Sequence, residues 1–92
     1  MKQFIMQNTF DTDLAEAPDN VVDHIQYYQK QFDDWLYNPE NEHGLWINPQ
    51  KKENGVSFAN SDFIAFLNKY ILANSCQKAR IISPYLFPIL SL

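Results

Sequence analysis

The most regular pattern of apolar positions in the chain begins shortly after Pro18. Apolar side chains recur there at spacings of four, three, four and three residues, at Val21, Ile25, Tyr28, Phe32 and Trp35. This spacing returns to the same face at every helical turn, so it predicts an amphipathic helix of about 18 residues. Asp19 or Asn20 can cap the start of this helix. Pro39 follows its end, because the residue before a proline avoids helical geometry.

A second helical pattern occupies the segment DFIAFLNKYILAN. Its larger apolar side chains keep helical spacing, at Phe63, Phe66, Leu67, Tyr70 and Ile71. Asn60 or Ser61 comes just before the pattern, and either side chain can accept a hydrogen bond from a free N–H group of the first turn. The sequence therefore predicts a second amphipathic helix that starts next to these two residues.

Short runs of apolar and β-branched residues predict the strands, which lie at residues 45–48, 56–60 and 79–83. Residues 2–7 form either a further strand or a fraying end. The pair Asn54-Gly55 favours a turn before the second of the strands, although the connection is longer than a two-residue hairpin. Residues 8–20 are acidic and rich in turn-forming residues, and we expect a loop there with room for one helical turn around Leu14.

The order of these elements predicts an α+β fold in a single small domain over residues 1–92. Two amphipathic helices would pack on a small antiparallel or mixed sheet of three to four strands, since each element must bury its apolar face. Hydrophobic residues make up 46% of the chain, which is enough for a core without disulfides.

The most apolar segment is the end of the chain, IISPYLFPILSL. It is shorter than the roughly 20 residues of a membrane-spanning helix, so we expect no membrane span. We expect residues 84–92 to dock on the core or at a homodimer contact.

The first residues lack the pattern of a signal peptide. A single cysteine, Cys76, excludes a disulfide within the chain, and the predicted location is the cytoplasm.

Few residues are suited to catalysis. His24 and His43 are the only histidines, and either would need tertiary proximity to Cys76 to form a nucleophile pair. Asp33 and Asp34 are adjacent, so on a helix they diverge by about 100° and cannot act as a facing pair. We therefore predict no catalytic residues and no cofactor. A small enzyme remains an outside alternative, which a deep pocket holding a histidine beside Cys76 would favour.

Metal and nucleic-acid sites are also disfavoured. Glu40, Glu42 and His43 form a local cluster, but no second histidine or cysteine lies at zinc spacing. The basic residues are scattered through the second half of the chain instead of forming a stripe with aromatic residues, so we expect no direct binding of DNA or RNA. We expect residues 40–43 to form a solvated turn without a metal ion.

Charge divides unevenly along the chain. Residues 1–49 carry two basic and nine acidic residues, a net charge of −7, whereas residues 50–92 carry five basic and two acidic residues, a net charge of +3.

A helical wheel places two tyrosines among aspartates opposite the apolar stripe of the first helix. Tyrosine is frequent at protein interfaces, and carboxylates around it would steer a basic partner. The predicted partner-binding residues are Asp23, Tyr27, Asp33, Asp34, Tyr37, Glu40 and Glu42. The alternative is that the tyrosines pack inside the fold and the acids serve solubility.

The segment GLWINPQKKENGVSFANSDFIAFLNKYIL, residues 44–72, resembles small immunity proteins of bacterial contact-dependent growth inhibition systems. The resemblance covers about a third of the chain and carries no functional residue by motif. It implies that the protein binds and neutralises a cognate toxin, commonly a nuclease, in the cytoplasm. The alternative function is a phage or mobile-element protein that mimics nucleic acid, or an adaptor in a larger assembly.

Overall fold

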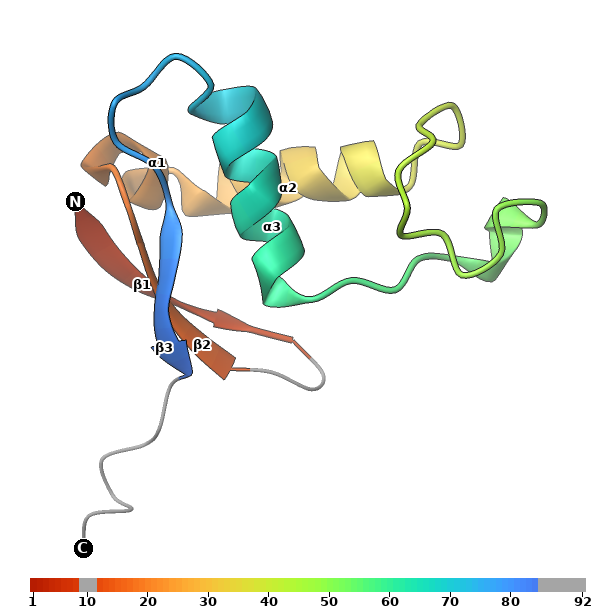
Figure 1. The fold of residues 1–92 in the computed structure, drawn as a ribbon, viewed down its shortest axis with the longest axis horizontal. Coiled ribbons are helices and arrows are strands. Elements are labelled where there is room, and N and C mark those ends of the chain that lie inside the picture. Colours follow the sequence, from red (N-terminus) through yellow and green to blue (C-terminus); the bar gives the residue numbers. More distant parts are fainter. Residues whose placement is uncertain (9–11, 85–92) are drawn as a thin grey trace, which may run out of the picture.

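The computed structural model of the protein describes residues 1–8 and 12–84. The expected docking of residues 84–92 therefore falls, apart from Pro84, on residues outside the described part. Three strands form one antiparallel sheet with the second strand in the middle: β1 (Lys2–Gln7), β2 (Thr12–Ala17) and β3 (Arg80–Pro84). The helical elements are α1 (Asp19–Asp23), α2 (Ile25–Leu36), the short 3₁₀ turn η1 (Lys52–Asn54), α3 (Asn60–Phe66) and the π-helical turn η2 (Leu67–Ile71). The predicted α+β fold class is confirmed (Figure 1).

The central strand β2 corrects the prediction of a loop at residues 8–20. Its sequence, TDLAEA, is poor in the β-branched and aromatic residues that favour strands. Ala15 and Ala17 nevertheless point into the core and are fully buried. Pairing with β1 along the whole strand, from Lys2 opposite Ala17 to Gln7 opposite Thr12, fixes the segment as a strand. Tertiary pairing has overridden local propensity here.

The strands predicted at residues 45–48 and 56–60 are wrong. The two segments run antiparallel, but they share only the isolated bridge between Trp46 and Val56. The backbone N–H of Ser57 donates to the Leu45 carbonyl at 2.9 Å beside this bridge. The Ile47 N–H also donates to the Gly55 carbonyl at 3.1 Å, but the pairing does not extend into a ladder. In Figure 1 this part of the chain forms the yellow-green segment on the side of the helices away from the sheet.

The long helix predicted after Pro18 is present as two helices that meet at His24. The backbone of His24 leaves helical geometry, with φ −123° and ψ 34°. The ring of His24 forms a hydrogen bond to the Asn20 carbonyl through Nδ1 at 2.9 Å. The apolar stripe still faces inward across this break, since Val21 and Phe32 are both buried.

Twelve buried apolar residues, most of them in the sheet and the helices, form one core: Met6, Ala15, Ala17, Val21, Phe32, Leu36, Phe63, Ile64, Phe66, Leu67, Leu72 and Ala79. Phe32 lies at the aromatic centre of this core. Its ring centroid is between 5.3 and 5.9 Å from those of four other rings, namely Trp35, Phe58, Phe63 and Phe66. Through these contacts α2 packs under α3, and Figure 1 shows the two helices crossing.

The start of α3 differs from the predicted cap. Ala59 occupies the capping position, and the Asp62 carboxylate accepts a hydrogen bond from the Ala59 N–H at 2.8 Å. This is the half of a capping box that a side chain in the first turn supplies. Asn60, one of the two predicted caps, is instead the first helical residue and is buried.

Asn60 joins the start of α3 to the sheet. Its Nδ2 donates to the Asp13 carboxylate at 2.9 Å and to the Met6 carbonyl at 3.3 Å. Its Oδ1 accepts a hydrogen bond from Asn8 at 3.3 Å. Asn60 is only 6% exposed. Loss of these bonds would therefore leave polar groups in the core without water to replace them.

We predict that Asn60→Asp lowers the free energy of unfolding by about 3 kcal/mol, because it removes two donated hydrogen bonds and brings a second carboxyl group to Asp13. Urea unfolding measures the loss. Adding Asp13→Asn restores a donor opposite an acceptor and should recover about 1 kcal/mol or more. Ser61→Asp, at the exposed neighbouring position, serves as the control and should leave stability nearly unchanged. An equal loss in both single variants would contradict this role for Asn60.

Candidate functional site

The α2 outer face, defined as Asp23, Tyr27, Lys30, Asp34 and Tyr37, consists of exposed residues throughout. Tyr27 is 59% exposed and Tyr37 is 57% exposed. The alternative expectation, that these tyrosines pack inside the fold, is therefore wrong. Asp23 is the last residue of α1, before the break at His24. Tyr27, Lys30, Asp34 and Tyr37 recur at helical spacing along α2 and its C-cap, so these four project from one face while the opposite face is held in the core.

The two tyrosines are held differently. Gln31 donates a hydrogen bond from Nε2 to the Tyr27 hydroxyl at 2.9 Å, and the Tyr27 ring meets the Tyr28 ring edge-on at 5.2 Å. Tyr37 lies just past the end of α2, where its backbone N–H donates to the Asp33 carbonyl at 3.0 Å. Tyr27 is thus oriented by its neighbours on the helix, whereas the backbone of Tyr37 closes the last turn.

Basic side chains pair with three of the predicted carboxylates. Lys2 Nζ lies 2.5 Å from Asp23, Lys30 Nζ lies 3.2 Å from Asp34, and Lys52 Nζ lies 2.7 Å from Glu42. The hydrogen bond to Asp23 and the charge of that carboxylate raise the pKa of the Lys2 ammonium above its usual value. Lys2 and Lys30 are exposed and exposed ion pairs are weak, so a partner's cation can replace these two lysines at little cost.

Asp33 and Glu40 are the two predicted carboxylates that form no ion pair with any described residue. Asp33 points to the side of α2 and lines a cavity together with Phe32 and Phe58. Glu40 lies in the turn after the helix, where its backbone N–H donates to the Asn38 side chain at 3.0 Å. Asp33 is therefore set apart from the α2 outer face by its position beside a cavity.

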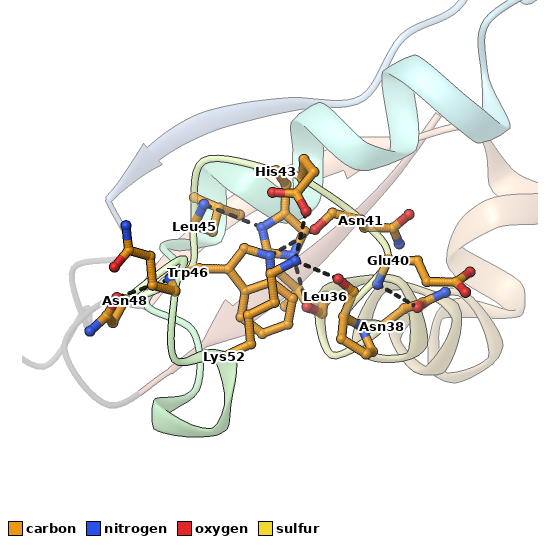
Figure 2. Close-up of polar contacts among 12 residues, drawn as sticks. Leu36, Asn38, Glu40, Asn41, His43, Leu45, Trp46, Asn48 and Lys52 are labelled. Carbon is orange, nitrogen blue, oxygen red and sulfur yellow. Dashed lines mark hydrogen bonds and ion pairs between the residues drawn. The ribbon is translucent and has the colours of Figure 1, made fainter.

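The segment from residue 38 to residue 56 is organised by stacked side chains. His43 packs between Trp35 and Trp46, with ring centroids 4.8 Å away on each side. Lys52 Nζ lies 5.5 Å from the Trp46 ring centroid, a cation–π contact. Figure 2 shows His43, Trp46 and Lys52 gathered beside the end of α2 at Leu36. We call the four side chains of Trp35, His43, Trp46 and Lys52 the ring column.

Hydrogen bonds from the ring column close the end of α2. His43 Nε2 is 2.7 Å from the Leu36 carbonyl, which can only accept, and the Leu45 N–H donates to Nδ1 at 3.2 Å. In this arrangement Nε2 of His43 is therefore the donor and Nδ1 the acceptor. Trp46 Nε1 donates to the Asn41 carbonyl at 2.7 Å, and Asn41 in turn donates to the Trp35 carbonyl at 2.8 Å.

The ring column shows that residues 40–43 are more than the solvated turn we expected. Both nitrogens of His43 bond to the backbone, so this ring cannot join Glu40 and Glu42 as a metal ligand without breaking the turn. Over the described residues, no three histidine, cysteine or carboxylate side chains group as a metal site would require. The feature of the sequence that could have indicated the ring column is the position of His43 and Trp46 shortly after the end of the predicted helix.

The residues considered for catalysis do not come together in the described part of the chain. Cys76 is exposed, and neither histidine forms a hydrogen bond with it there. His24 bonds to a backbone carbonyl on α1, and His43 belongs to the ring column. Within residues 1–8 and 12–84, no helix has both the length and the apolar character to cross a membrane.

Comparisons with protein-family models, with curated proteins and with solved structures find no match for this chain.

We predict that Gly55→Ala lowers the free energy of unfolding by about 1–3 kcal/mol, because Gly55 has φ +91° and ψ −164°, a conformation open almost only to glycine. Nothing lies within 4 Å of a Cβ atom at Gly55 or at Gly44, so sterics do not distinguish the two sites. Gly44 does not have a positive φ, and Gly44→Ala should be neutral or slightly stabilising. Thermal unfolding of both variants tests this, and equal shifts would contradict it.

Proposed function

We propose that this protein is a non-enzymatic cytoplasmic immunity protein. It binds a basic toxin that is a nuclease and neutralises it by covering the surface where the toxin binds nucleic acid. The observation that carries the proposal is the α2 outer face, where two tyrosines are more than half exposed among aspartates. The resemblance of residues 44–72 to immunity proteins supports the same assignment.

Two exposed tyrosines on one helix face favour a protein partner. Each brings a large, rigid surface with few rotatable bonds, and tyrosine is among the residues that most often anchor interfaces. From Tyr27 to Tyr37 the helix advances about 15 Å, at 1.5 Å per residue, which is a span that one protein interface readily covers. The proposed anchors are therefore far enough apart to fix the partner's orientation.

The charges favour a basic partner. Asp33 and Glu40 form no ion pair with described residues, and Asp23 and Asp34 are held only by exposed lysines. A nuclease needs cationic side chains where it binds phosphates. Carboxylates at the α2 outer face would occupy those cations and exclude the nucleic acid. Long-range attraction would also speed the encounter, which matters when a toxin must be bound before it acts.

The direct test is capture of the product of the gene immediately upstream by this protein, with growth of cells that express that product as a second readout. The proposal predicts capture and protection of growth. No capture, together with no protection against any neighbouring toxin, would overturn it. Variants of the α2 outer face must then weaken both readouts in the same order.

We predict that Asp23→Asn combined with Asp34→Asn slows association with the partner by about 3- to 10-fold at low ionic strength, with little change in dissociation. The salt dependence of association should flatten as well. Glu16→Gln combined with Glu53→Gln removes the same charge away from this face and serves as the control. Stopped-flow association at several salt concentrations measures both pairs, and equal slowing would contradict a specific role for the α2 outer face.

We predict that Tyr27→Ala or Tyr37→Ala mainly speeds dissociation, by about 30-fold if either residue contributes 2 kcal/mol as a hot spot. Neither change should unfold the domain, because both side chains are exposed. Tyr70→Ala is the matched control, since Tyr70 is a 48% exposed tyrosine on η2. Surface plasmon resonance gives the rates. A loss of stability of several kcal/mol with unchanged binding by the folded fraction would move the interface elsewhere.

A further inference from the structure

A cavity of about 260 Å³ opens between the side of α2, the end of β1 and the segment that leads into α3. Three aromatic rings line it: Phe32 from α2, Phe58 from the segment that leads into α3, and Phe63 from α3 itself. Phe58 is 38% exposed and packs edge-on against Phe32 at 5.5 Å. Part of an aromatic wall is therefore open to solvent beside a helix that carries the proposed binding face.

The cavity suits one side chain better than a whole small molecule. Sites for drug-sized ligands measure about 300–1,000 Å³, so this cavity falls below that range. It also lies next to the α2 outer face, because Asp33 on its rim is one helical turn before Tyr37. A partner that covers Tyr37 would thus bring its neighbouring side chains to the mouth of the cavity.

The polar groups around the cavity select for a cation. Asp33 is the only charged residue among the described lining residues, and no described side chain pairs with it. The Gln29 amide lies on the same side of α2, one turn earlier. A side chain that enters here meets a carboxylate at the rim and an aromatic wall at Phe58.

We propose that this cavity binds an arginine side chain of the basic partner, an inference that rests on the proposed function and adds the anchor residue on the other protein. A guanidinium group is flat, so it can stack on the Phe58 ring while its N–H groups bond in pairs to the Asp33 carboxylate. The ammonium group of lysine is compact and strongly hydrated, and it can satisfy only the carboxylate. The cavity therefore discriminates between the two basic side chains.

The test is an NMR titration of the full chain with N-acetyl-arginine methylamide, and with the corresponding lysine and norleucine compounds. The arginine compound should shift the amide signals of Asp33, Phe58 and Asn60 with millimolar affinity. The lysine compound should bind several-fold more weakly. The norleucine compound, which has no charge, should not shift these signals at matching concentration.

Adjacent variants separate the cavity from general charge. Asp33→Asn should weaken arginine binding about tenfold. Asp34→Asn removes the same charge one residue away, at a carboxylate already paired with Lys30, and should weaken it less than twofold. Phe58→Leu should reduce the preference for arginine over lysine, because it removes the stacking surface.

Three results would overturn this inference: no shifts at the cavity, equal binding of the norleucine compound, or equal losses in Asp33→Asn and Asp34→Asn. Each of them leaves capture of the upstream gene product untouched, so the proposed function can hold while the arginine site fails. Conversely, arginine binding at the cavity with neither capture nor protection of growth would overturn the proposed function and leave the arginine site without its proposed partner.

Discussion

The packing of Phe32 against α3 is the contact on which the rest of the molecule depends. Four rings surround it within 5.9 Å, two of them from α3. Because the Phe32 ring is held in the core, the orientation of α2 about its own axis is fixed, and Tyr27 and Tyr37 face outward. The same ring forms a wall of the cavity beside Asp33. The position of Phe32 therefore determines which residues of α2 are exposed, and it also shapes the cavity beside them.

The ring column gives α2 a rigid end. Because His43 bonds to Leu36 and Leu45 while stacking on Trp46, side-chain contacts hold the turn after the helix in place. Glu42 is fixed on the same turn through Lys52. A preformed surface loses less conformational entropy on binding than a flexible loop would. The fold therefore presents its tyrosines and carboxylates in positions that need little rearrangement.

The helix stripe was predictable from the sequence because its periodicity reports burial directly, and the exposure of Tyr27 follows from the same wheel. β2 was not, since its core positions hold small alanines whose burial comes only from pairing with β1. The apolar residues of the two failed strands, such as Trp46, are explained by the ring column, which needs contacts with Trp35 across a turn. The cavity required Phe58, a residue 25 positions from Asp33 in the sequence. No local pattern could join them.

We propose that a basic partner covers the α2 outer face. Chemical nitration of the tyrosines, mapped by mass spectrometry with and without the product of the upstream gene, tests it most directly. Tyr27, Tyr37 and Tyr70 are all about half exposed or more in the free protein, so all three should react. In the complex, Tyr27 and Tyr37 should become protected while Tyr70 keeps reacting. Protection of Tyr70 with unchanged reaction at Tyr27 and Tyr37 would contradict the account.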